Sequence, residues 1–170
     1  MHRSIEQAAP HEAELAMEVI SLCKVHMQAH GSDQWNDLYP QLETVQADAN
    51  AGSLYLLRDG DVCVGAICLN EVQAPEYAAL PWRHDPARIL VVHRLCVRPD
   101  YQGHGAARML MDFAEVLAQK EGYGAIRLDT YTGNPRAIDL YVKRGYEIAG
   151  KTELSARRLP VVCFEKRIDA

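Results

Sequence analysis

The chain has 170 residues, of which 48% are hydrophobic, and it carries a formal net charge of −5. This length suffices for one core, and we expect a single domain over residues 1–170. The negative charge and the absence of a basic stripe argue against nucleic acid as a partner. No apolar run approaches the roughly 18 residues of a membrane span, and no signal-peptide pattern opens the chain. We therefore expect a cytoplasmic protein with no membrane partner.

The hydrophobic periodicity predicts helices and strands along most of the chain. In chain order we expect helices over residues 12–27 and 42–50, strands over 53–57, over 62–69 and from 89 to before Pro99, a helix after Gly105, a strand over 125–131, a helix from Asn134, and strands over 146–149 and 161–166. Asp59-Gly60 is a strong hairpin signal, and residues 74–88 form a long loop rich in proline and aromatic residues. This order predicts a mixed sheet with helices on both faces.

The cysteines give no pattern of a metal or disulfide site. They are five in number and none is spaced as CxxC. Those within apolar strand patterns behave as small hydrophobic residues. We therefore expect neither a structural metal nor a disulfide framework.

The segment that says most about function is a strand, a glycine-containing loop and a helix. An apolar, β-branched run over residues 89–92 predicts a buried strand, and Pro99 stops regular pairing. Gly103 and Gly105 follow, before an amphipathic helix. A loop of this kind at a helix N-terminus presents backbone amides to an anion.

The charges around this loop support an anionic ligand. The positive end of a helix dipole normally favours Asp or Glu. Here the expected first turn offers Gln102, His104 and Arg108, and no carboxylate appears before Asp112. We interpret the missing anion as a ligand phosphate. The alternative is a helix whose start is merely exposed.

Two common phosphate motifs do not account for this loop. Residues 145–152, GYEIAGKT, have the spacing of a nucleotide-binding P-loop but lie far from this loop, and GHGAAR lacks the third glycine of a dinucleotide fold. The loop instead resembles the [R/Q]-x-x-G-x-[G/A] signature of the Gcn5-related N-acetyltransferase (GNAT) family. Gln102, Gly105 and Ala107 match that signature, and the preceding run LCVRP matches the family's strand L-x-V-x-P.

A second segment strengthens the resemblance. Residues 134–146 resemble the family's N-x-x-A-x-x-L-Y-x-x-x-G-[F/Y] pattern. Asn134 is expected to cap a helix that begins at Pro135, and Gly145 to end it. Two motifs in the right order and at the right spacing identify the chain as resembling this family from residue 89 to 146 at least.

The resemblance implies a fold, a cosubstrate and a set of contacts. The fold is a mixed, mostly antiparallel α/β sheet with helices on both faces and a splayed central strand pair. The cosubstrate is acetyl-CoA, with no metal: loop amides hold its pyrophosphate, the motif strand pairs with its pantetheine, and the amide of Val97 binds the oxyanion. The implied contacts are Leu95, Cys96, Val97, Gln102, Gly103, His104, Gly105, Ala106, Ala107, Arg108, Asn134 and Tyr141.

Acetyl transfer to an amine also needs a base and a donor to the leaving thiolate. Tyr141 matches the family's tyrosine that hydrogen-bonds the CoA sulfur; the alternative is a core residue. Asp129, five residues before Asn134, lies where some members place a catalytic carboxylate. The alternative for Asp129 is a surface carboxylate that pairs with Arg127 or Arg94.

Other groups compete with Asp129 for the role of base. Glu71 ends a strand, and Glu76 lies in the loop expected to flank the acceptor. His93 titrates near neutral pH when exposed, although a lone strand histidine is more often packed.

The acceptor is expected to be a small-molecule or peptide amine. Trp35, Tyr39, Tyr77 and Trp82 fall in the segments that line the acceptor cleft in the family. Aromatic rings there either surround an amine by cation–π contact or belong to the core. The rival function is a non-catalytic module that senses acyl-CoA, and a third possibility, a nucleotide-binding regulatory domain, requires the glycine loop to prefer ATP over CoA. The resemblance also allows a homodimer.

Overall fold

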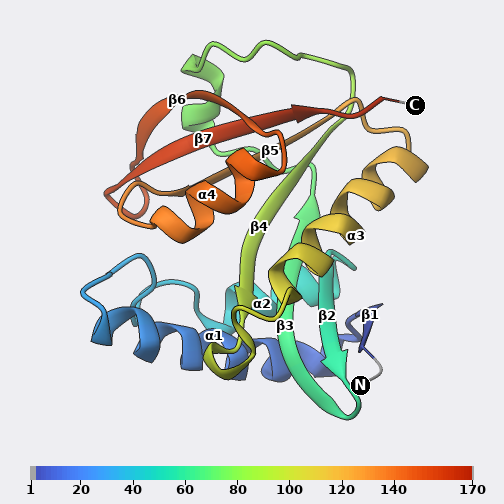
Figure 1. The fold of residues 1–170 in the computed structure, drawn as a ribbon, viewed down its shortest axis with the longest axis vertical. Coiled ribbons are helices and arrows are strands. Elements are labelled where there is room, and N and C mark those ends of the chain that lie inside the picture. The colour runs from blue at the N-terminus through green and yellow to red at the C-terminus, as the bar shows by residue number, and fades with distance from the viewer. Residues whose placement is uncertain (1–2, 170) are drawn as a thin grey trace. The chain divides into compact units, whose positions relative to one another are not determined.

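A computed structural model describes residues 3–169 (Figure 1). The helices are α1 (Ala13–Ala29), α2 (Leu42–Asn50), α3 (Ala106–Lys120) and α4 (Pro135–Lys143). The strands are β1 (Arg3–Gln7), β2 (Leu54–Asp59), β3 (Val62–Asn70), β4 (Ile89–Val97), β5 (Ala125–Tyr131), β6 (Glu147–Leu154) and β7 (Leu159–Arg167). The expected helices and strands are therefore present, and the largest shift in a boundary extends β6 to Leu154.

The expected element order is wrong at the N-terminus, where it lacks strand β1. This strand pairs antiparallel with β2, with Ile5 opposite Leu57. It lies at the edge of the sheet, and its residues are half-buried or exposed. An edge strand is held by main-chain hydrogen bonds on one side, so a polar sequence such as RSIEQ forms one without an apolar run.

The chain divides into two compact units, which are described separately. The first unit comprises the residues up to Leu69 together with His93–Phe113, and the second comprises Asn70–Val92 together with the residues from Ala114 onward. The strands follow the hydrogen-bonded order β1-β2-β3-β4-β5-β7-β6. The β1–β2, β2–β3, β5–β7 and β6–β7 pairs are antiparallel and β4–β5 is parallel, which confirms the mixed, mostly antiparallel sheet.

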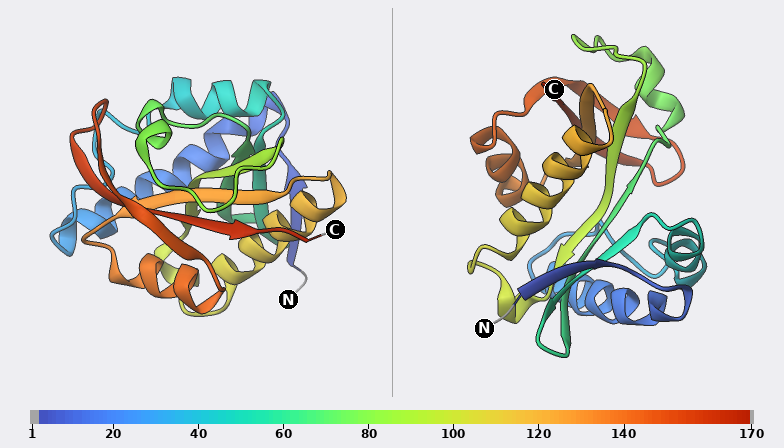
Figure 2. Two further views of the ribbon diagram at one scale, coloured as in Figure 1. Left: turned by 90° about the horizontal axis from the view of Figure 1, so that it is seen from above. Right: turned by 90° about the vertical axis from the view of Figure 1, so that its right-hand side faces the viewer.

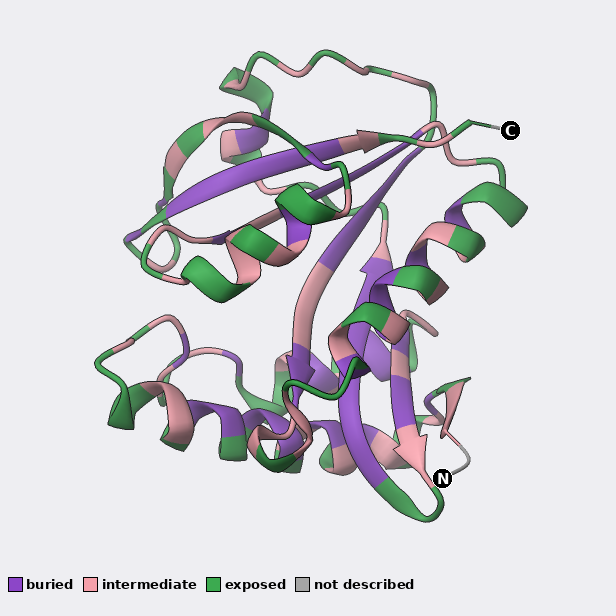
Figure 3. Ribbon diagram, in the orientation of Figure 1, coloured by how far each residue is buried: buried purple, intermediate pink, exposed green. Residues whose placement is uncertain are grey.

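The first unit carries helices on both faces of its strands (Figure 2). Helices α1 and α2 pack on the face of β2 that bears Leu54 and Leu56. The start of α3 lies on the other face, where the rings of Phe113 and Tyr55 are 4.9 Å apart. Figure 3 shows the resulting pattern on α1, where buried and exposed residues alternate along the helix.

In the second unit, the side chains of β7 pack against different elements on the two faces of the strand. Phe164 faces α4, where its ring centre lies 5.5 Å from that of Tyr141. Val161 and Cys163 pack with Tyr77 of the loop after β3. The parallel β4–β5 register ends at Val92 opposite Leu128, and both strands continue beyond these residues.

Among residues 3–169, no helix is both long and apolar enough to cross a bilayer. All five cysteines are free thiols and are buried.

Candidate active site

The glycine loop of the first unit connects β4 to α3. Gly103 and Gly105 both have a backbone φ of +81°, which side chains with a Cβ rarely adopt. A Cβ built on either glycine meets no atom within 4 Å, so the space in front of this backbone is open. The loop thus forms an open cradle of the kind that main-chain amides offer to an anion.

The start of α3 differs in detail from the expectation. Because the two glycines turn the chain, the helix begins only at Ala106, so Gln102 and His104 precede the first turn instead of lying in it. Gln102 donates from Nε2 to the carbonyl of Val97 at 3.0 Å, which braces the loop against the strand before it. The carbonyl of His104 accepts a 3.0 Å hydrogen bond from Arg3.

The electrostatics of the loop agree with an anionic ligand. The first turn of α3 contains no acidic residue and does contain Arg108. Arg3 and Arg98 approach the ring of Tyr101, which closes the 3₁₀ turn before the loop, at 6.0 and 5.9 Å. Arg3 and Arg98 are paired with Asp59 and Asp100, so Arg108 is the cation that lies in the first turn of a helix end that is itself positive.

The second motif folds as its residues predict. The side chain of Asn134 caps α4 by accepting a 3.2 Å hydrogen bond from the amide of Ala137. Gly145 ends the helix with a φ of +81°, and the amide of Tyr146 returns to the carbonyl of Tyr141 at 3.0 Å. This C-terminal closure fixes the last turn of the helix, which carries Tyr141.

Tyr141 is buried, with its ring beside those of Tyr146 and Phe164. Burial raises the pKa of Tyr141, and the negative charge of Asp129 raises it further. The phenol is therefore protonated at neutral pH and is available as a hydrogen-bond donor.

Asp129 pairs with neither of the arginines considered from the sequence. Its carboxylate accepts a 2.6 Å hydrogen bond from the phenol of Tyr77, and Arg157 lies 3.8 Å away. Burial raises the pKa of Asp129, while Tyr77 and Arg157 oppose that rise. Arg94 instead forms an ion pair with Asp48, and Arg127 donates a hydrogen bond to Gln73 in the loop after β3.

Two of the other possible bases already bind a neighbouring residue, and the third is half-buried. Glu71 is exposed and binds Arg88 at 2.9 Å, an ion pair that lowers the pKa of the Glu71 carboxyl. Glu76 is hydrogen-bonded to Ser155, whose side chain and amide lower the pKa of the Glu76 carboxyl. His93 is half-buried in β4.

A profile of the acetyltransferase (GNAT) family matches residues 19–146, a span that contains both motifs. The chain belongs to this family. N-acetyltransferase 8F1 from Rattus norvegicus is 28% identical over 106 residues, which are 61% of this chain and 43% of that relative. The chain thus spans less than half the length of the curated relative it matches.

Solved structures agree on the fold of this GNAT chain. An acetyltransferase of the GNAT family from Streptococcus agalactiae has a TM-score of 0.85 at 23% identity, covering 99% of this chain and 96% of its own. The PaiA N-acetyltransferase from Thermoplasma acidophilum, in complex with coenzyme A, has a TM-score of 0.74 at 15% identity, covering 98% of this chain and 99% of its own.

The four aromatic residues chosen from the sequence occupy different surroundings in this GNAT chain. Trp35 is 4% exposed and lies in the core of the first unit. In the same unit, the phenol of Tyr39 accepts a 2.9 Å hydrogen bond from Arg94. Tyr77 and Trp82 belong to the second unit, with ring centres 5.1 Å apart.

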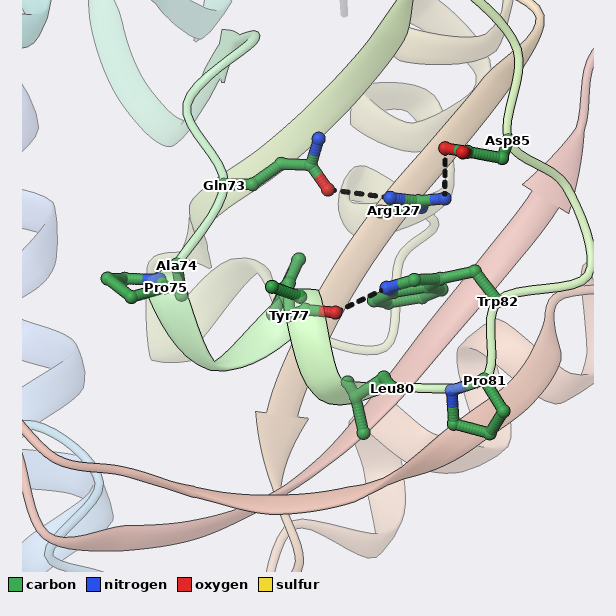
Figure 4. Close-up of a pocket in the computed structure, with 10 residues that line it drawn as sticks. Gln73, Ala74, Pro75, Tyr77, Leu80, Pro81, Trp82, Asp85 and Arg127 are labelled. Carbon is green, nitrogen blue, oxygen red and sulfur yellow. Dashed lines mark hydrogen bonds and ion pairs between the residues drawn. The ribbon is translucent and has the colours of Figure 1, made fainter.

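Tyr77 and Trp82 line a hollow of about 470 Å³ under the loop after β3 (Figure 4). The indole of Trp82 donates to the carbonyl of Tyr77 at 2.7 Å, and the guanidinium of Arg127 stacks on the Trp82 ring at 4.2 Å. Arg127 also donates to Gln73 and to the carbonyl of His84, both at 2.7 Å. One face of the indole is thus already covered by a cation.

Sequence reasoning missed three charged residues that shape these surroundings. Arg127 is 4% exposed, and Glu165, which lies opposite it on β7, is 1% exposed. Glu165 accepts the amides of Arg83 and His84, at 2.7 and 3.1 Å, and so holds the loop on the sheet. Arg127 and Arg94 were considered only as partners of Asp129, and Glu165 was not considered. The sequence signal that could have found them is a charged residue at alternating positions of a predicted strand, because such a residue needs a partner when it is buried.

Proposed function

We propose that this chain transfers the acetyl group of acetyl-CoA to a primary amine of a small molecule or peptide, by direct attack of the amine in a ternary complex. The observation that carries the proposal is the loop before α3. Two glycines in the left-handed region leave open space beside its main chain, and the first turn of α3 contains no acidic residue. Gly103 to Arg108 would hold the pyrophosphate there, and Leu95 to Val97 the pantetheine.

The reaction needs a neutral amine. A lysine-like amine of pKa about 10.4 is neutral about once in 2,500 molecules at pH 7, a free-energy cost of about 4.6 kcal/mol, and an α-amine of pKa about 8 costs about 1.4 kcal/mol. We assign proton removal to Asp129, directly or through water. Its raised pKa brings it closer to the working pH than an exposed carboxylate such as Glu71 or Glu76.

Tyr141 is assigned to the leaving thiolate. Because burial raises its pKa, full proton transfer from the phenol to a thiolate would run uphill. Tyr141 therefore acts by donating a hydrogen bond to the developing charge on sulfur. Asn134, which already caps α4, is assigned to the CoA arm, and Tyr39, Tyr77 and Trp82 to the acceptor.

Calorimetric titration with acetyl-CoA, CoA and ATP tests the cosubstrate. We expect acetyl-CoA and CoA to bind and ATP not to bind. A panel of amines assayed by CoA release then tests the transfer. Binding without transfer to any amine would favour the acyl-CoA-sensing module, and the absence of acetyl-CoA binding would refute the assignment of the loop.

A further inference from the structure

Arg94 has an unusual backbone conformation within strand β4. Its φ is +50°, in a region that residues with a Cβ rarely occupy. Arg158 shares this feature, but it lies in the turn between β6 and β7, where such angles are common. A strained residue inside a strand persists only where its surroundings hold it, and such residues gather at functional sites.

The side chain of Arg94 is held by several hydrogen bonds, of which the one to the thiol of Cys68 is the longest at 3.5 Å. Its Nε and Nη2 atoms bind the two carboxylate oxygens of Asp48 at 2.6 and 2.7 Å, and Nη1 donates to the phenol of Tyr39 at 2.9 Å. The side chains of Arg94 and Asp48 are only 11% and 10% exposed. A two-pronged pair of this kind fixes both the position and the plane of a guanidinium, which a lysine ammonium cannot reproduce.

The position of Arg94 in the strand gives this arrangement a role. The registered pairing of β4 with β5 ends at Val92, two residues before Arg94. The next three residues, Leu95 to Val97, form the segment that the proposed function places against the thioester arm. A local kink bends a strand and disrupts its hydrogen-bond ladder at that point, so it re-aims the peptide groups that follow.

The far end of that segment is fixed as well. The carbonyl of Val97 accepts hydrogen bonds from the thiol of Cys23 at 3.2 Å and from the amide of Gln102 at 3.0 Å. Leu95 to Val97 are therefore held between two anchors, the ion pair of Arg94 and the double contact to Val97.

We propose that Arg94 is a positioning residue for the acetyl group: its contacts with Asp48 and Tyr39 hold the kink in β4 that aims the main-chain N–H groups of residues 95–97 at the thioester carbonyl. This inference rests on the proposed function. It predicts that Arg94 and Asp48 affect recognition of the acetyl group and leave recognition of the CoA phosphates unchanged, since those lie at the glycine loop.

The test compares the dissociation constants of CoA and acetyl-CoA, whose ratio is the acetyl preference, by calorimetry. The proteins are the wild type and the variants Asp48→Asn, Arg94→Lys and Arg94→Gly. We expect the wild type to prefer acetyl-CoA and each variant to lose that preference, by about tenfold for one hydrogen bond worth about 1.4 kcal/mol. CoA affinity should fall less than acetyl-CoA affinity, because CoA lacks the carbonyl that these N–H groups bind and keeps its phosphate contacts at the glycine loop.

The glycine variant is the sharpest of the three. Glycine adopts a φ of +50° without strain, so Arg94→Gly permits the kink but removes the contacts that hold it. If Arg94→Gly keeps the acetyl preference, the kink needs no anchor and the inference is overturned. The infrared carbonyl stretch of bound acetyl-CoA, labelled with carbon-13 at the carbonyl, should be lowered in the wild type and return toward the free value in the variants.

A matched control is Arg58→Gln, which breaks the ion pair between Arg58 and Glu12 in the same unit. This pair ties β2 to the turn before α1. It should leave the acetyl preference unchanged, and equal loss in Arg58→Gln would overturn the inference because general loosening would explain it. A wild type that binds CoA and acetyl-CoA equally overturns the inference alone. A wild type that binds neither refutes the proposed function.

Discussion

The phenol of Tyr77 donates a 2.6 Å hydrogen bond to Oδ2 of Asp129. The two residues are separated by 52 positions in the chain, and each was chosen from the sequence for a different role. Their contact ties the loop after β3 to the carboxylate on β5. A change in that loop is therefore expected to alter the acid–base behaviour of Asp129.

Tyr77→Phe should raise the pKa of Asp129, because the Tyr77 hydroxyl opposes the effect of burial. The carbon-13 carboxyl resonance of Asp129 should then titrate at higher pH than in the wild type. Loss of the hydrogen bond should also cost about 1–2 kcal/mol of folding stability, measured by urea unfolding. Tyr123→Phe is the matched control, since the Tyr123 phenol bonds Glu71 at the surface. An unshifted resonance in Tyr77→Phe would show that the hydroxyl does not control Asp129.

The difference in folding stability between Asp129→Asn and the wild type should change with pH in a definite direction. Burial raises the folded pKa of Asp129, so the stability linked to its protonated form is present below the unfolded pKa of about 3.9 and is lost as pH rises through the folded value. Asparagine does not titrate. The variant should therefore gain stability relative to the wild type as pH rises through that window, measured by urea unfolding from pH 3.5 to 7.5. A relative loss would mean that the folded pKa is depressed.

Gly105→Glu should abolish acetyl-CoA binding, because its side chain fills the open cradle and adds a negative charge where phosphate is expected. Gly60→Glu is a close control: Gly60 has a φ of +61° and equally open surroundings in the β2–β3 turn. Each variant should lose about 1 kcal/mol of stability from backbone strain. Calorimetry should show lost affinity in Gly105→Glu alone, and retained affinity there would remove the loop from the binding site.

Tyr141→Phe should lower kcat by about tenfold or more while acetyl-CoA affinity changes little, because the hydrogen bond to sulfur strengthens as the thiolate forms. Tyr146→Phe is the control, since its ring lies 5.9 Å from that of Tyr141 and the family motif accepts either aromatic residue there. The measurement is steady-state kinetics with an amine found in the panel. An unchanged kcat in Tyr141→Phe would exclude Tyr141 from the reaction.

The fold was predictable where the signal is local. Helix α2 has its expected bounds, and Asn134 and Gly145 cap α4 as their residue types require. Strand β1 was not predictable, because an edge strand needs a partner's main chain and little apolar surface of its own.

Contacts between residues distant in sequence could not be predicted from the sequence for the same reason. Arg94 meets Asp48 across 46 positions, and Asp129 meets Tyr77 across 52. Neither spacing has a period that a sequence pattern could reveal, since both contacts exist only once separate elements pack. The type of residue needed at the site was thus easier to predict than its partner.

The hold of Glu165 on the loop after β3 has a consequence for how this protein could be modified. The carboxylate accepts hydrogen bonds from two main-chain amides, those of Arg83 and His84. It therefore constrains the path of the loop through the main chain of these two residues, without specifying their side chains. Exposed residues of the loop can therefore be randomised in a library while its course is retained, provided that Glu165, Tyr77 and Trp82 are kept. A change of acceptor would then come from new side chains on an unchanged backbone.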